Sequence, residues 1–158
     1  MATRPDIKTF ANLEAAFAGE SMAHIKYRYF ARIARAHGDE ATALVFEATA
    51  EQEVQHALGH LDLLYPPSTL TPAKVLQMAI DGETYEYTEM YPSFRKQAEE
   101  DGAAAALAEI DGQIAESREH AEQFTAQLAK AQKRFAALAK VEERHANHYR
   151  ATLANLHG

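Results

Sequence analysis

The stretch AEQEVQHA, residues 50–57, places Glu53 three positions before His56 in the middle of a segment that otherwise predicts a helix. Side chains three or four positions apart lie on one face of a helix. Burying an ion on such a face is costly unless an opposite charge lies beside it. The residues on either side of this pair show whether the rest of the chain supplies that charge.

Glycine and proline residues divide the sequence into long helical segments. Gly38 supplies a left-handed cap that ends the first segment, and the pair Pro66-Pro67 ends the second. Asp39 and Thr71 are suited to cap the helices that follow them. We expect helices at about 7–36, 40–64, 72–100 and 103–156. No segment shows the alternation of a strand, so the sequence predicts an all-α fold, most simply an antiparallel four-helix bundle with an extended last helix or an extra helical segment.

Composition limits the class of protein. The 158 residues include 47% hydrophobic ones, which predicts one domain over 1–158. The absence of cysteine excludes disulfides and cysteine-ligated metals, so any metal must be bound by His, Asp and Glu. A net charge of -7 argues against nucleic acid as a partner. MATRPDIKTF does not resemble a signal peptide, and no window is apolar enough to span a membrane, so we expect a soluble, cytoplasmic protein.

Every predicted helix carries a carboxylate in the middle of its apolar stripe. None of these stripes contains Lys or Arg to neutralise the charge. The alternative, solvated faces with coincidental spacing, leaves unexplained why all four helices share the feature. The stripe carboxylates and the histidines one turn after two of them are Glu20, Glu53, His56, Glu83, Glu86, Glu142 and His145.

A pair of iron ions would compensate these charges. Two ferrous ions bring four positive charges against five carboxylates, so the site nearly neutralises itself when both histidines are neutral. Oxygen-rich ligation with one imidazole for each ion suits iron or manganese better than zinc or calcium. Glu-x-x-His on two helices and Glu on the other two is the pattern of ferritin-like di-iron bundles. We therefore expect a ferritin-like fold holding two iron ions, with manganese or zinc as substitutes.

Four segments resemble the metal-binding helices of the rubrerythrin family and occur in the same order. They are AAFAGESMAHIKYRYFA at 15–31, AEQEVQHA at 50–57, AIDGETYEYTEMYPSF at 79–94 and FAALAKVEERHANHY at 135–149. Together they are specific, and they cover most of residues 10–156. The resemblance implies that the seven residues above are the metal ligands.

The resemblance also implies an activity and further roles. Rubrerythrins generally reduce hydrogen peroxide to water in oxidative-stress defence. Tyr27 and Tyr91 match family tyrosines that hydrogen-bond the ligand carboxylates, and the ligand exchange known for the family on reduction corresponds here to Glu86 giving way to His56. The catalytic residues implied are therefore Glu86, His56, Tyr27 and Tyr91.

Two features depart from the family pattern. Most rubrerythrins carry a rubredoxin domain, which needs cysteines that this chain does not have. The chain therefore resembles stand-alone, erythrin-like members, and electrons are expected from an external donor protein. About 25 further residues, 103–127, precede the family-like last helix and contain a rival cluster, EIDGQIAESREHAEQF.

The rival cluster contains Glu116, Glu119 and His120. Two rows of residues, each with a seven-residue repeat, run along the last helix and include Glu142 and His145. Glu116 and Glu119 lie outside these rows, and His120 is only adjacent to one of them. The sequence therefore predicts a solvated face for this cluster.

Other residues near the stripes have less specific expectations. His24 and His60 lie one turn from ligands and are expected to pack or to support ligands. Met90 is expected in the core. Pro92 lies inside the third helix, where it should remove one backbone hydrogen bond and bend the helix.

The sequence leaves two alternative functions open and predicts a second copy of the chain as a partner. A ferroxidase or iron-handling protein that uses oxygen is the second function, and a bundle that only scaffolds a partner is the third. An uninterrupted helix over 103–156 would be about 80 Å long, too long for its own bundle to cover. We therefore expect a homodimer, with exchanged helices as one arrangement. Asp111-Gly112 is the turn signal that would interrupt this helix.

Overall fold

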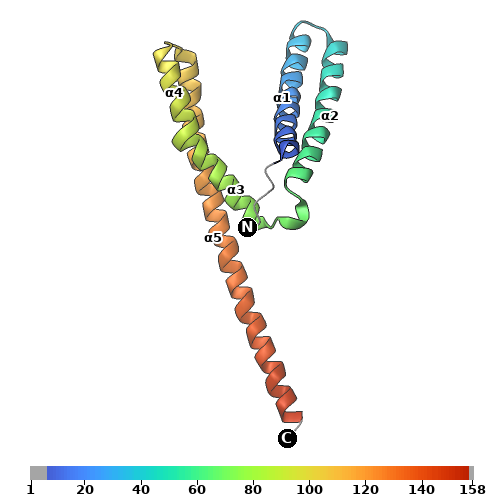
Figure 1. The fold of residues 1–158 in the computed structure, drawn as a ribbon, viewed down its shortest axis with the longest axis vertical. Helices are drawn as coiled ribbons and strands as arrows, with labels where there is room; N and C mark the ends of the chain where they lie inside the picture. Colours follow the sequence, from blue (N-terminus) through green and yellow to red (C-terminus); the bar gives the residue numbers. More distant parts are fainter. Residues whose placement is uncertain (1–6, 157–158) are drawn as a thin grey trace. The chain divides into compact units, whose positions relative to one another are not determined.

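The computed structural model describes residues 7–156. No strand occurs in this range, and the predicted all-α class is confirmed. The third expected helix comprises three consecutive elements, and the other helices begin and end within one residue of the expected bounds. The elements are α1 (Lys8–Ala36), α2 (Glu40–Leu64), the 3-10 helix η1 (Pro67–Thr69), α3 (Pro72–Tyr85), the π-helical segment η2 (Glu86–Met90), α4 (Tyr91–Glu100) and α5 (Ala104–Leu156) (Figure 1).

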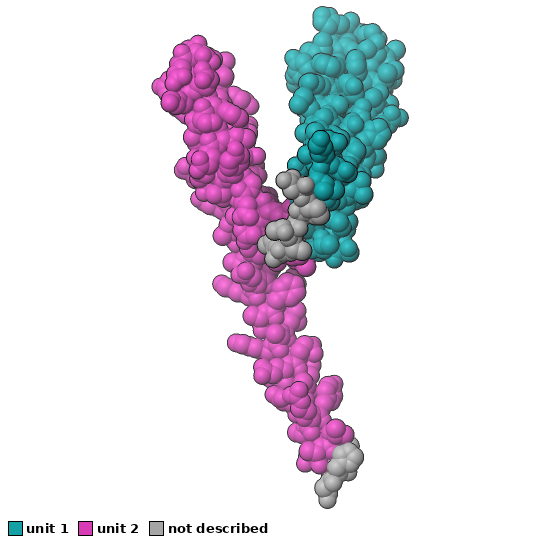
Figure 2. Space-filling view, in the orientation of Figure 1, with its two compact units in different colours: residues 1–70 teal, residues 71–158 magenta. Residues whose placement is uncertain are grey.

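The chain divides into two compact units, residues 1–70 and 71–158, coloured separately in Figure 2. Each is described by itself, and the expectation of one domain over the whole chain stays a prediction. None of the helices in the described range is both long and apolar enough to cross a membrane. Of the stretch MATRPDIKTF, residues 1–6 lie outside the described range.

The first unit is a hairpin in which α1 packs along α2. On α2 the buried positions recur every seven residues, and small side chains at most of them let the two helices approach closely. On α1 the stripe predicted from three-and-four spacing is half-buried or buried throughout. It comprises Phe10, Leu13, Phe17, Glu20, His24, Tyr27 and Ala31. At the turn between the helices, Arg35 binds Glu40 and Glu47 at 2.9 and 2.8 Å. The buried α2 positions are Ala43, Ala50, Ala57 and Leu64.

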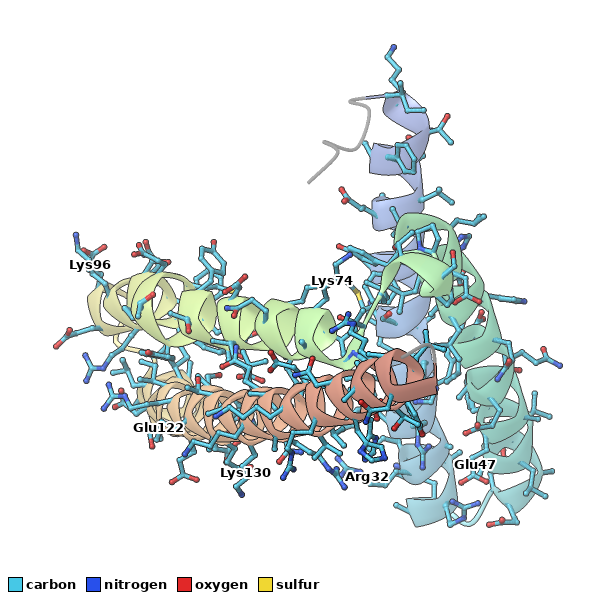
Figure 3. All side chains as sticks on the ribbon, turned by 90° about the horizontal axis from the view of Figure 1, so that it is seen from below. Arg32, Glu47, Lys74, Lys96, Glu122 and Lys130 are labelled. Atoms are coloured by element: carbon cyan, nitrogen blue, oxygen red, sulfur yellow. The ribbon has the colours of Figure 1, made fainter. Side chains whose placement is uncertain are left out.

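The second unit is formed by α3, η2 and α4 packed along the first part of α5. Ser117 and Ala121 are buried in this contact, and the seven-residue registers predicted for the helix stay half-buried as far as Ala131. Glu122 and Lys130 project from the opposite side of α5 (Figure 3). From position 132 onward most residues of α5 are exposed.

The caps confirm the sequence signals at the helix ends. Asp39 accepts a hydrogen bond from the Thr42 N–H at 3.0 Å, and Thr71 accepts one from the Lys74 N–H at 3.3 Å. Gly38 and Gly102 have φ of 80° and 68°, in the left-handed region that favours glycine. Both chain reversals therefore depend on a glycine in the left-handed region.

Asp111-Gly112 does not interrupt α5, which is one helix of 53 residues. The Asp111 carboxylate accepts a hydrogen bond from Arg95 Nε on α4 at 2.6 Å. The side chain that would favour a turn is thus engaged across the helix pair instead, and the extended last helix is confirmed.

Three parts of the predicted stripes are more exposed than the sequence suggested. Leu63 at the end of α2 and Phe94 on α4 are 61% and 51% exposed. On α5, the stripe beyond Ala131 is also exposed, because α3 begins at Pro72 and its hairpin is much shorter than α5. The exposed large side chains there are Phe135, Leu138, Tyr149 and Leu153.

Candidate metal centre

The first unit brings three predicted ligands together. Glu20 on α1 and Glu53 and His56 on α2 each offer one ligand atom, and these atoms all lie within 4.8 Å of one another. His56 Nδ1 lies 2.9 Å from Glu53 Oε2 and 4.0 Å from Glu20 Oε2. One helical turn separates Glu53 from His56, and the close packing of α1 on α2 adds Glu20. Two carboxylates and one imidazole are a donor set suited to iron or manganese.

The electrostatics of this cluster favour the charged form of Glu53. A hydrogen bond with His56, and then one with Glu20, lowers the pKa of Glu53 below its ordinary value. The Glu53 side chain is only 14% exposed, whereas that of His56 is 60% exposed. Glu53 is therefore an anionic carboxylate at neutral pH, placed so that an ion can reach it from the His56 side.

His24 contacts the neighbouring helix rather than the cluster. Its Nδ1 lies 2.9 Å from the Ala50 carbonyl oxygen, so the Nδ1–H donates to the backbone of α2. This bond fixes one face of α1 against the buried seam of α2, which is the packing role among the two expected for His24. His60, also on a stripe, is half-buried.

The second unit places Glu83 and Glu86 against α5. His120 Nδ1 lies 3.4 Å from Glu83 Oε1, and Ser117 Oγ donates to Glu86 Oε2 at 3.0 Å. Ser117 is 3% exposed. Burial raises the pKa of the nearby Tyr91 phenol, and the Glu86 and Glu83 carboxylates raise it further. Tyr91 therefore keeps its proton and can donate it in a hydrogen bond.

The π-helical segment η2 explains how Pro92 is accommodated. The Tyr91 N–H bonds to the Glu86 carbonyl five residues earlier, and α4 begins with Pro92 in its first turn, where no N–H is needed. The helix accommodates Pro92 with a wider turn, in which the backbone hydrogen bond spans five residues instead of four. Glu86 opens this wide turn, and π-helical segments frequently occur at functional sites.

Glu142 and His145 are not brought to Glu83 and Glu86 within this unit. They follow Ser117 and His120 by 25 residues, which is about 38 Å along a helix. Their side chains are 76% and 59% exposed, and they contact each other at 3.9 Å.

The three residues of the rival cluster are exposed, as the sequence predicted. The ring of His120 also contacts Glu83, because His120 lies one turn from the buried Ser117. Ser117 and His120 are thus the site residues that the sequence reasoning missed. The signal for them was that Ser117 lies in the apolar register.

Tyr27 is half-buried on α1. Its ring packs against Phe46 on α2 and Phe30, with centroids 5.9 and 6.4 Å apart. The hydrogen bond predicted from Tyr27 to a ligand carboxylate stays a prediction.

The similarity to known proteins covers the helices that carry most of these residues. A family model described as Rubrerythrin matches residues 11–65 and 60–128, and therefore includes Ser117 and His120 but ends before Glu142. A rubrerythrin of Porphyromonas gingivalis is 38% identical over 134 residues, covering 77% of this chain and 66% of that protein. A nigerythrin of Nitratidesulfovibrio vulgaris is 37% identical over 131 residues, covering 75% and 64%. The chain thus spans just under two thirds of the length of both relatives.

A solved structure of nigerythrin in a fully reduced, all-ferrous state is also similar. It is 34% identical, and the match covers 83% of this chain and 70% of that one with a TM-score of 0.41.

Proposed function

Because the chain belongs to the rubrerythrin family, we propose that it is a non-haem di-iron protein that reduces hydrogen peroxide to water. The observation that carries this proposal is the convergence of Glu20, Glu53 and His56 within 4.8 Å on α1 and α2. Electrons come from a donor protein outside these 158 residues, because they contain no cysteine for a rubredoxin-type site. Glu83 and Glu86 supply further carboxylates from the second unit.

The residues present fit a pair of iron ions. The first unit supplies two carboxylates and an imidazole, and the second supplies Glu83 and Glu86. From α5 the sequence predicts Glu142 and His145 as the remaining ligands. The helix α5 holds this pair far from Glu83 and Glu86 of the same unit, so its place in the centre stays a prediction. Manganese or zinc would occupy the same donors as substitutes.

The bound iron pair supplies two electrons, which with two protons convert one hydrogen peroxide, by cleavage of its O–O bond, into two waters. The side chains of the protein orient the ligand carboxylates and supply negative charge to the iron. Tyr91, whose raised pKa keeps it protonated, and Tyr27 are proposed to donate hydrogen bonds to ligand carboxylates. Glu86 would hold the oxidised ions and His56 the reduced ions, so the carboxylate charge would be present when the charge on the iron is highest.

A homodimer is the proposed assembly. The C-terminal part of α5 exposes Phe135, Leu138, Tyr149 and Leu153, in a stretch whose described residues are mostly exposed. Large exposed apolar patches mark interaction surfaces. A second copy of α5 presents the same residues and would cover them in an isologous contact, with or without exchanged helices. The cytoplasmic location expected from the sequence stays a prediction.

Stopped-flow mixing tests the activity. Protein reconstituted with two iron ions and reduced without oxygen is mixed with hydrogen peroxide or with dissolved oxygen at equal concentrations. We expect oxidation by peroxide to be the faster reaction. Metal-free protein is the control. If oxygen is the faster oxidant and added ferrous iron is converted to a stored ferric mineral, the peroxidase proposal fails and the ferroxidase function replaces it.

A further inference from the structure

We propose that His120, rather than His145, is the histidine that α5 contributes to the metal centre, and that Ser117 stands where a ligand carboxylate would be. This inference rests on the proposed di-iron function. Its first support is contact: His120 Nδ1 lies 3.4 Å from Glu83 Oε1, and Ser117 Oγ lies 3.0 Å from Glu86 Oε2. The carboxylates of α3 and η2 thus already have their α5 neighbours within the same unit.

A repeat within α5 explains why two segments compete for this role. SREHAEQFTAQLA at 117–129 and EERHANHYRATLA at 142–154 share a histidine, four small or apolar identities and an aromatic position. Their offset of 25 residues corresponds to about seven turns. Corresponding residues of the two segments therefore lie on the same face of the helix. At the first position Ser117 corresponds to Glu142, so the first copy lacks the carboxylate three residues before the shared histidine.

The packing distinguishes the two copies of this repeat. Ser117 is buried and its segment lies along α3 and η2, whereas Glu142 and its segment are exposed. The family match also ends at residue 128, within the first copy and before the second. Both observations favour the first copy as the partner of Glu83 and Glu86.

Charge also favours the first copy. With Ser117 and His120 the centre contains the carboxylates of Glu20, Glu53, Glu83 and Glu86, which balance the four positive charges of two ferrous ions. Adding Glu142 would leave one negative charge uncompensated, which is costly in a partly buried site. The imidazole count is unchanged, since His56 and His120 still provide one for each ion.

Ser117 is a positioning residue in this arrangement. Its hydroxyl donates to Glu86 Oε2 and leaves Oε1 of the same carboxylate for an ion. Because Ser117 is neutral, a change of charge at this position should alter the redox potential of the centre, whereas a remote position would not.

Metal content of two matched variants tests the histidine assignment. His120→Ala and His145→Ala remove similarly exposed rings, 49% and 59%, from one helix. Each is reconstituted anaerobically with ferrous iron, passed over a chelating resin and assayed for iron. We expect His145→Ala to keep two ions and His120→Ala to lose at least one. Loss of iron from His145→Ala, or full retention by His120→Ala, overturns the assignment.

The midpoint potential of the iron provides a second readout. Ser117→Glu and Ser117→Gln introduce side chains of equal size, so the Gln variant controls for packing. We expect a lower potential for Ser117→Glu, because an added carboxylate stabilises the ferric state. Equal potentials would show that position 117 is not at the metal and would overturn the inference. If the unmodified protein does not hold two ions, the proposed function itself fails, which is a different outcome.

Discussion

His56 Nδ1 lies 2.9 Å from Glu53 Oε2, across one turn of α2 and beside Glu20 of α1. This contact brings a carboxylate and an imidazole together in the middle of a helix. These are the two kinds of ligand proposed for the iron. It also shows why the predicted stripe on α2 departs from a purely apolar one. The buried alanines every seven residues hold the helices together, and the ligand residues lie beside that seam.

Replacing Glu53 should remove the metal. Because Glu53 would serve as a ligand to both ions of the proposed centre, we expect Glu53→Ala to fall from two bound ions to none. Iron content after reconstitution and desalting measures this. Glu119→Ala is the control, because Glu119 is exposed on α5. A Glu53→Ala protein that keeps two ions, or a Glu119→Ala protein that loses them, would contradict the ligand assignment.

The helix bounds and the first-unit cluster could be predicted because the signals for them are local. Gly38, Asp39 and Thr71 act on their own turns, and the three-residue spacing of Glu53 and His56 fixes their shared face. Family membership supports the same helices. The sequence therefore indicated where each helix lies and which side of α2 carries the candidate ligands.

The pairing between α3 and α5 could not be predicted in the same way. Residues 25 positions apart lie on one face of a helix, so periodicity cannot distinguish Ser117 from Glu142. The choice depends on which turn of α5 packs against Glu86, a long-range property. The π-helical segment is a similar case. Pro92 signals a missing backbone bond, but a bend and a widened turn both accommodate it.

Two glycines of the second unit should respond to alanine with opposite signs. Gly102 has φ of 68° at the reversal before α5, so Gly102→Ala should lower the free energy of unfolding by about 1 kcal/mol. Gly112 lies in mid-helix with no atom within 4 Å of an added Cβ, so Gly112→Ala should raise it by about 0.5–1 kcal/mol. Urea unfolding followed by circular dichroism measures both. Stabilisation by Gly102→Ala would contradict the turn geometry.

A charge on the exposed face of α5 should weaken the homodimer. Leu138 is 53% exposed on this face, and a carboxylate there would be desolvated when a second copy covers it. We expect Leu138→Glu to be monomeric at micromolar concentration by light scattering. Ala137→Glu, which adds the same charge one position away, should remain dimeric. A monomeric mass for the unmodified chain would rule out the dimer.

Glu86 should determine how fast the reduced protein reacts with hydrogen peroxide. As the iron loses electrons its charge rises, and a carboxylate that ligates only in the oxidised state lowers the energy of that product and of the step leading to it. We expect Glu86→Ala to keep two ions, because Glu83 and the first-unit ligands remain.

Its reaction with peroxide should slow by at least about tenfold, the smallest effect usual for groups that only support ligands. Glu89→Ala, in the same π-helical segment but exposed, should react like the unmodified protein. Stopped-flow oxidation at several peroxide concentrations compares the three proteins. If Glu86→Ala reacts as fast as Glu89→Ala, Glu86 does not supply charge to the oxidised centre. Its bond with Ser117 would then be a packing contact only, because a carboxylate that the iron never uses cannot change the rate.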